Sequence, residues 1–262
     1  MYFDTAGIEV SPWLPPLVGF AISLFTSMGG VSGAFLLLPF QVSVLGFTSP
    51  AVSATNQVFN VVATPSGVYR YLREGRMVWP LAWMIVLGTL PGVAVGALLR
   101  IIWLPDARDF KLFVAAVLLY IGLRLGRDIL SPKSPPKGGS LAAPVVPARI
   151  PNRIAYHYGG ELFSANRWAV FSLAAVVGVI GGAYGIGGGA IIAPFLVSVF
   201  ALPVHTVAGA ALLGTFVTSV AGIAFYHFIA PLYPHMAVAP DWGLGLLFGL
   251  GGAAGMYSGA RL

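Results

Sequence analysis

Long apolar segments, separated by short charged stretches, constrain the fold of this chain more than any other feature. They cover roughly residues 17–45, 50–69, 78–99, 112–125, 168–200, 206–230 and 242–257. A helix needs about 20 apolar residues to cross a hydrocarbon core about 30 Å thick. Backbone in lipid must satisfy its own hydrogen bonds, and the apolar runs do not alternate, so the pattern favours helices over strands. The sequence therefore predicts an all-α integral membrane protein.

The charged residues are too few to build a water-soluble surface. They make up 8% of the 262 residues, against about 25% in soluble domains. The acids lie between the apolar segments or at their edges, and the bases lie in the flanking loops. The net charge of +6 therefore indicates orientation in a lipid bilayer rather than nucleic-acid binding. We expect a multi-pass protein of the cytoplasmic (inner) membrane with no cofactor and no metal.

A segment rich in proline and glycine divides the chain. It covers residues 131–167 and includes the Pro135–Pro136 and Gly138–Gly139 pairs. Such a composition does not sustain a continuous helix. We therefore expect a first transmembrane repeat at residues 1–130, a linker at residues 131–167 and a second transmembrane repeat at residues 168–262.

The two halves share a glycine motif. The first half contains Gly30, Ser32, Gly33, Pro39 and Phe40, and the second contains Gly185, Gly187, Gly188, Pro194 and Phe195 at the same spacing. An internal repeat of this kind is typical of many transporter folds.

Loop charges predict that the two repeats cross the membrane in opposite directions. Arg70, Arg73 and Arg76 follow the second apolar segment, whereas the equivalent loop at residues 231–240 has no lysine or arginine. By the positive-inside rule the first loop is cytoplasmic and the second is external. The basic linker is then cytoplasmic as well. The second half ends without a counterpart of residues 112–125, so either a final helix is missing or the repeat is incomplete.

Each half opens with a stretch that is too long for one upright crossing and is interrupted by glycines and then a proline. Glycine costs about 1 kcal/mol in a helix interior and proline about 3 kcal/mol, so each stretch is expected to form a broken, re-entrant or hairpin helix. A helix that restarts near Ser32 or Gly187 points free N–H groups into the membrane, which favours an anion. The alternative is that the glycines only allow close helix packing.

Polar side chains inside the apolar segments are further candidates for substrate binding. They are Thr55, Asn56, Gln57 and Asn60 in the first half, with Thr206, Thr215 and Thr218 in the second. Amide and hydroxyl donors can replace the water around an oxyanion without adding a fixed charge. Asn56 and Asn60 lie one helical turn apart and so share a face. The alternative role is hydrogen bonding between helices.

His205 and His227 are the candidates for a proton relay, because histidine titrates near physiological pH. Both lie near predicted span ends, where an interfacial histidine is ordinary. Coupling to a proton or to sodium is therefore an open expectation.

The glycine run at Gly185–Gly189 followed by Pro194, its counterpart from Gly30 to Pro39, and the sequence from Pro50 to Asn56 resemble the TauE/SafE sulfite exporters. The resemblance implies a secondary carrier that moves sulfite, thiosulfate, sulfoacetate or a related organosulfonate by alternating access without ATP. The chain departs from the common motif at Ser32 and Ala34, which stand where the second half has Gly187 and Gly189.

Two other functions compete with a carrier. A passive anion channel can be built from the same inverted halves. An intramembrane serine protease of the rhomboid type is the remote alternative, because Gly30 to Gly33 resembles its Gly-x-Ser-Gly motif and His227 could act as a base. The repeat argues against the protease, since the counterpart of Ser32 is Gly187. We therefore expect a transporter rather than an enzyme.

Overall fold

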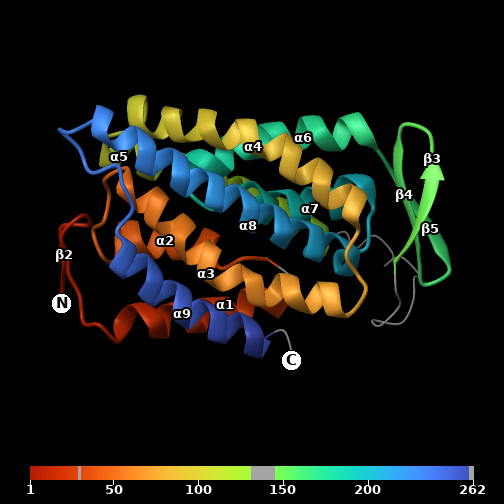
Figure 1. The fold of residues 1–262 in the computed structure, drawn as a ribbon, viewed down its shortest axis with the longest axis horizontal. Coiled ribbons are helices and arrows are strands. Elements are labelled where there is room, and N and C mark those ends of the chain that lie inside the picture. The colour runs from red at the N-terminus through yellow and green to blue at the C-terminus, as the bar shows by residue number, and fades with distance from the viewer. Residues whose placement is uncertain (29–30, 131–144, 260–262) are drawn as a thin grey trace.

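The computed structural model describes residues 1–28, 31–130 and 145–259, and in these ranges the chain is mostly helical (Figure 1). The helices are α1 (Leu14–Met28), α2 (Ala34–Ser43), α3 (Ala51–Arg73), α4 (Trp79–Ile102), α5 (Ala107–Leu130), α6 (Arg167–Tyr184), α7 (Gly188–Phe200), α8 (Val204–Ile229) and α9 (Trp242–Gly259). The strands are β1 (Tyr2–Phe3), β2 (Ile8–Glu9), β3 (Val146–Ile150), β4 (Arg153–Tyr158) and β5 (Glu161–Asn166). A short 3-10 helix, Ala230–Leu232, follows α8.

Helices long and apolar enough to cross a membrane are present. Within the described ranges they cover Trp79–Ile102, Arg167–Tyr184 and Val204–Leu232. Large apolar side chains also face outward: Phe25 is 73% exposed, Leu123 is 62% exposed and Phe228 is 79% exposed. Such side chains are unfavourable in water but suit hydrocarbon. The protein is therefore an integral membrane protein.

The helices pack in two sets that run in opposite directions. Glycine contacts place α9 beside α1 and α3 with residue numbers rising together, so these three helices are parallel. The same contacts make α6 parallel to α4. Helix α3 is antiparallel to α8, because Gln57 near the start of α3 lies against Gly222 and Tyr71 near its end lies against Gly209. Each half thus packs its long fourth helix, α4 or α9, against the first helix of the other half.

Matched glycine stripes allow these two exchanged contacts. Gly88, Gly92 and Gly96 of α4 lie against the backbone of α6, and Gly251, Gly255 and Gly259 of α9 lie against the backbone of α1. A methyl group at any of these positions would collide with a neighbour in the other helix. Both stripes repeat every four residues, which keeps them on one helix face. Small residues bring the helices close enough for direct backbone contact.

Part of the expected linker is folded. Residues 146–166 form an antiparallel sheet in the order β3–β4–β5, which the all-α prediction did not include. The composition of β4 explains the sheet, because Ile154, Ala155, Tyr156 and Tyr158 are buried while Arg153 and His157 are exposed. The sequence interpretation considered only helix-breaking residues and overlooked this short apolar and aromatic run, which is typical of a strand. Residues 131–144 of the expected linker lie outside the described ranges.

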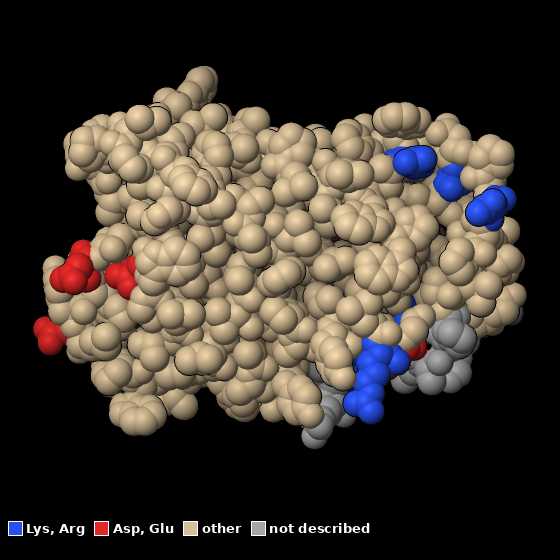
Figure 2. Space-filling view, viewed as in Figure 1, with Lys and Arg blue, Asp and Glu red and all other residues tan. Residues whose placement is uncertain are grey.

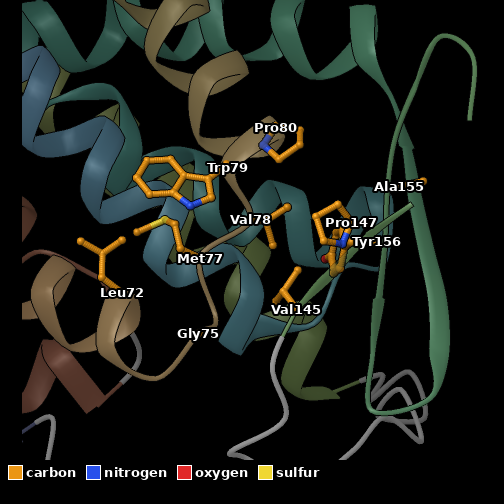
Figure 3. A pocket seen from close by; sticks show the side chains of 10 residues that line it. All are labelled: Leu72, Gly75, Met77, Val78, Trp79, Pro80, Val145, Pro147, Ala155 and Tyr156. Atoms are coloured by element: carbon orange, nitrogen blue, oxygen red, sulfur yellow. The ribbon is translucent and has the colours of Figure 1, made fainter. Parts of the chain in front are cut away.

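The sheet covers one end of the helix bundle and contacts both halves (Figure 1). We call this the sheet end. On the first half, Val145 N donates to Gly75 O at 3.0 Å. On the second half, the Tyr156 and Thr206 hydroxyls lie 2.7 Å apart. A cavity of about 200 Å³ lies at this seam, lined by Met77, Val78 and Trp79 on one side and by Val145, Pro147 and Tyr156 on the other (Figure 3).

Charge is distributed unevenly along the bundle. On the face shown in Figure 2, lysine and arginine gather at the sheet end, where some acidic surface lies beside them, and most of the acidic surface lies at the opposite end, near the N-terminus. The expectation that all bases lie in flanking loops is wrong for Arg100, which lies in the last turn of α4 and is fully buried. Arg76, the other base that is buried among the described residues, pairs with Glu74.

The contact between the sheet and α8 generates a stability prediction. Thr206 Oγ1 donates to Pro203 O at 2.8 Å, so the Tyr156 hydroxyl is the donor to Thr206. Burial raises the pKa of Tyr156 to about 12, which keeps that proton in place. We expect Tyr156→Phe to lower the free energy of unfolding by about 1 kcal/mol, measured as a lower apparent melting temperature in detergent.

Tyr158→Phe is the matched control. The Tyr158 side chain is equally buried, but its hydroxyl has no hydrogen-bond partner among the described residues. Removing it should leave the melting temperature unchanged or raise it. Equal destabilisation by both variants would contradict the assigned contact.

Candidate substrate site at two helix breaks

Two interruptions of the helical backbone lie deep in the bundle. Helix α1 ends at Met28 and α2 begins at Ala34, whereas α6 ends at Tyr184 and α7 begins at Gly188. In the second interruption Gly185 and Gly187 have φ values of 81° and 68°, which L side chains rarely adopt. The predicted site residue Gly30 lies outside the described residues. We call these two segments the first and second breaks.

A single amide of α3 joins the two breaks. Asn56 Nδ2 donates to Ala34 O at 3.0 Å and to Gly185 O at 3.1 Å. Asn56 Oδ1 accepts a hydrogen bond from Gln41 Nε2 at 3.1 Å. Asn56 is fully buried. One nitrogen thus contacts the start of α2, directly after the first break, and the second break, so the two regions lie side by side. The hydrogen bond between Tyr184 and Phe35, which are 149 positions apart in the sequence, joins the same two regions.

Asn60, one turn further along α3, makes a second connection. Its Nδ2 donates to Ile186 O at 3.0 Å, and its Oδ1 accepts a hydrogen bond from Ser32 Oγ. Ser32 Oγ in turn accepts from Ala34 N at 3.3 Å. The predicted residues Ser32, Asn56 and Asn60 therefore come together. They satisfy backbone groups of the breaks, as in the alternative role of hydrogen bonding between helices.

Three further side chains brace the breaks, and the sequence interpretation missed them. Ser53 Oγ donates to Ala183 O at 2.9 Å, Tyr184 Oη donates to Phe35 O at 3.0 Å, and Tyr226 Oη donates to Gly182 O at 3.2 Å. Tyr184 directly precedes the glycine motif, so its position carried a signal. Tyr226 could not be found in this way, because only tertiary packing brings the end of α8 to α6.

Other buried polar groups on α3 and α8 have no partner among the described residues. Both amide atoms of Gln57 and the hydroxyl of Ser219 are buried and make no hydrogen bond within the described part of the chain. Gln57 lies against Gly222 of α8, and Ser219 lies beside Gly187 together with Thr215. An unpaired buried polar group is costly, so these atoms are available for a polar ligand. Ser219 follows Thr215 by one helical turn, which was the overlooked signal.

The first break has a similar border. Gly33 precedes α2 and lies beside the hydroxyl groups of Ser23 and Thr26 of α1. Both hydroxyls are buried and unpaired within the described ranges, as is Gln41 Oε1. Unused hydrogen-bonding groups thus flank both breaks.

The remaining predicted residues have local roles in the structure. Thr55 Oγ1 accepts from Asp241 N at 2.9 Å, which ties α3 to the start of α9. Thr215 donates to Ala211 O at 3.0 Å within α8. Gly188 N donates to Thr218 Oγ1 at 3.3 Å, so one N–H at the start of α7 is satisfied by protein.

The two histidines lie away from the breaks. His205 is in the first turn of α8 and His227 near its end, roughly 33 Å apart along the helix. The ring of His227 packs against Phe228 and Trp242, whereas Ser32 is bonded to Asn60. The proposed protease pair, Ser32 and His227, is therefore not assembled. No three histidine, aspartate or glutamate side chains gather to hold a metal within the described ranges.

A helical bundle with apolar spanning helices and a buried polar centre between two backbone breaks defines an integral membrane protein of the transporter class. The chain belongs to the sulfite exporter TauE/SafE family, whose pattern matches residues 16–262. The family consists of membrane transporters rather than enzymes. No curated protein and no solved structure shows significant similarity to the chain.

The second break generates a prediction about folding. A methyl group at Gly185 would collide with the backbone of Ser53, and the φ of 81° is unfavourable for alanine. Left-handed backbone costs about 1–2 kcal/mol and overpacking about 1–3 kcal/mol. We expect Gly185→Ala to abolish most of the monodisperse protein seen by size-exclusion chromatography in detergent.

Gly46→Ala separates the two effects. Gly46 has a φ of 73° but no atom within 4 Å of the position its methyl group would take. In this variant only the left-handed backbone should lower the stability, by about 1–2 kcal/mol, and the protein should remain monodisperse. If the two variants behaved alike, close packing against Ser53 would not explain the requirement for Gly185.

Proposed function

We propose that the protein is a secondary transporter that moves a small sulfur-containing anion, such as sulfite, thiosulfate, sulfoacetate or a related organosulfonate, across the cytoplasmic membrane by alternating access. The observation that carries the proposal is the meeting of the two breaks at Asn56, next to the unpaired amide of Gln57 and hydroxyl of Ser219. The family supplies the transporter class, and the breaks supply a place for the substrate.

The packing supports two inverted repeats as the basis of the mechanism. Helices α1, α3 and α9 run opposite to their counterparts α6, α8 and α4, and the exchanged pairs α1–α9 and α4–α6 are the most extensive helix contacts. An axis in the membrane plane would relate such halves. Inverted repeats related by a pseudo-two-fold axis allow one protein to adopt two states, one open to each side, around one fixed site.

The polar groups around the breaks favour an anion. Amide and hydroxyl donors dominate, and the start of α7 adds the positive end of a helix dipole. The described acidic side chain with the least exposure, Asp241, is committed to the backbone at Leu244 and Ala6. A cation would lack a counter-charge at the breaks. An oxyanion needs only the donors that Gln57, Ser219 and the backbone provide.

The site is closed in this structure. Ser32, Asn56, Gln57, Asn60 and Thr215 have no exposed surface. A substrate can therefore enter only after helices move apart at one end. This requirement fits a carrier better than a permanently open pore, in which at least one polar group of the pathway would face water.

The charge distribution supports a cytoplasmic sheet end. Arg70, Arg73 and Arg76 lie in the α3–α4 region at this end, together with the bases of the sheet. The positive-inside rule assigns such an end to the cytoplasm. Residues 145–166 of the linker are then cytoplasmic.

A binding screen tests the anion assignment. Purified protein is heated with sulfite, thiosulfate, sulfoacetate, sulfate, taurine or chloride. We expect at least one sulfur anion to raise the melting temperature, because a ligand at 100 times its Kd stabilises the folded state by about 2.7 kcal/mol. If none of these anions shifts the transition, the proposed substrate class is wrong.

Two variants locate the site. Gln57→Leu removes a buried amide that has no partner, so we expect unchanged or higher stability without anion but a smaller anion-induced shift. Asn60→Leu is the contrast, since it breaks contacts to Ser32 and Ile186 and should lower stability before any anion is added. A Gln57→Leu protein with a full anion response would exclude Gln57 from the site.

Exchange kinetics distinguish the carrier from a channel. In proteoliposomes loaded with unlabelled anion, a carrier should accelerate uptake of labelled anion, because the loaded site returns faster than the empty one. A pore gives no such acceleration. Uptake that is indifferent to internal anion and does not saturate would favour the channel.

A further inference from the structure

Arg100 is a buried cation that has no acidic partner among the described residues. Its side chain lies at the end of α4 opposite the sheet, and the residue has no exposed surface. The ion pairs of the described residues join Arg70 and Arg76 to Glu74 and do not include Arg100. An arginine in the last turn of a helix stabilises the helix dipole, but this role does not require burial. Removing the guanidinium from water is costly unless something compensates its charge.

The groups around Arg100 compensate it only in part. Its guanidinium donates to Thr48 O at 2.7 Å and to Leu104 O. The Phe110 ring covers one face of the guanidinium, and its centroid lies 3.7 Å from Arg100 Cζ. The Nε–H of Arg100 has no acceptor in the part of the chain that the structure describes. A guanidinium has five N–H donors in a planar fork, which matches the oxygens of an anion. In this structure Arg100 contacts only neutral groups among the described residues, namely two carbonyls and an aromatic ring.

Arg100 contacts the segment between α2 and α3 and also lies close to a residue that braces the second break. Thr48 lies in the segment that leads from α2 to α3, and its carbonyl accepts a hydrogen bond from Arg100. On the other side, Tyr226 packs with Ala97 and Ile101, the residues on either side of Arg100 in α4. The Tyr226 hydroxyl donates to Gly182 O, just before the second break.

We propose that Arg100 is a second anion-binding residue, located between the end of the bundle opposite the sheet and the two breaks. The ligand is an oxyanion with two terminal oxygens on one atom, as in sulfite or a sulfonate, because a guanidinium binds such groups in a bidentate manner. This inference rests on the proposed anion transport. It adds a site for the substrate on the path between the end of the bundle opposite the sheet and the groups at Gln57 and Ser219.

Binding at Arg100 would also change the local structure. An oxyanion on the guanidinium competes with Thr48 O and Leu104 O for the same N–H groups. When Thr48 is released, the segment between α2 and α3 loses one of its attachments to α4. Binding of the substrate at Arg100 therefore loosens the end of the bundle opposite the sheet.

The test uses the full chain in detergent and in proteoliposomes, with sulfite and sulfoacetate as probes. Arg100→Gln removes the charge and Arg100→Lys keeps it without the planar fork. A charged hydrogen bond contributes about 1.5–3 kcal/mol, so we expect Arg100→Gln to weaken anion binding by roughly ten- to a hundredfold. Arg100→Lys should fall between this variant and the wild type.

Arg108→Gln is the control for a general loss of positive charge. Arg108 is exposed in the first turn of α5, and its removal should leave the Kd and the exchange rate unchanged. An equal loss of affinity in Arg108→Gln and Arg100→Gln would show that the effect comes from long-range electrostatics and not from binding at Arg100. That result would overturn the proposal.

The outcomes separate this proposal from the proposed function. If the wild type binds and exchanges anions and a folded Arg100 variant does so with wild-type Kd, Arg100 only supports the fold and the second site is wrong. If Arg100→Gln does not fold, the Kd of Arg100→Lys decides in the same way. If the wild type neither binds nor exchanges either probe, the proposed transport of these anions fails first.

Discussion

The shared hydrogen bonds of Asn56 are the contact on which the centre of this protein depends. A break in a membrane helix leaves carbonyl groups without partners, and hydrocarbon offers no water to replace them. Asn56 Nδ2 satisfies Gly185 O in the second break and also donates to Ala34 O, in the first residue of α2 directly after the first break. Asn60 adds Ile186 O. Irregular backbone can persist at this depth because α3 supplies the donors.

The surrounding helices make that arrangement possible. The fourth helix of each half packs against the first helix of the other half, so neither half forms a separate bundle. The glycine stripes on α4 and α9 bring these helices into backbone contact, where dispersion forces act over many atoms. Such pairs move as rigid units more readily than they separate. Motion is therefore expected between the paired units, at the breaks and near α3 and α8.

The polar groups of the centre fall into two sets with different consequences. Asn56, Asn60 and Ser53 are committed to backbone carbonyls and hold the breaks in shape. Gln57 and Ser219 have no partners within the described part of the chain. The first set gives rigidity, and the second set is available to a substrate. Arg100 adds a charge outside this centre, with neutral acceptors that an anion can displace.

The sequence by itself determined the membrane class, the family and the duplicated glycine motif, because apolar length, scarcity of charge and repeated spacing are local properties of the chain. It also located Asn56 and Asn60, since polar residues inside an apolar segment stand out. It did not reveal the sheet at residues 146–166, because the interpretation of this segment relied on its helix-breaking residues and not on the apolar and aromatic residues of β4.

Only the tertiary structure decided which polar groups are used and which are free. Gln57 and Asn56 are neighbours in sequence and alike in chemistry, yet Asn56 faces both breaks whereas Gln57 faces Gly222 of α8. Likewise, Arg100 resembled an ordinary interfacial base until the packing of α5 and the α2–α3 segment buried it. Hydrogen-bond partners and burial depend on contacts between residues far apart in the chain, which spacing along the sequence does not encode.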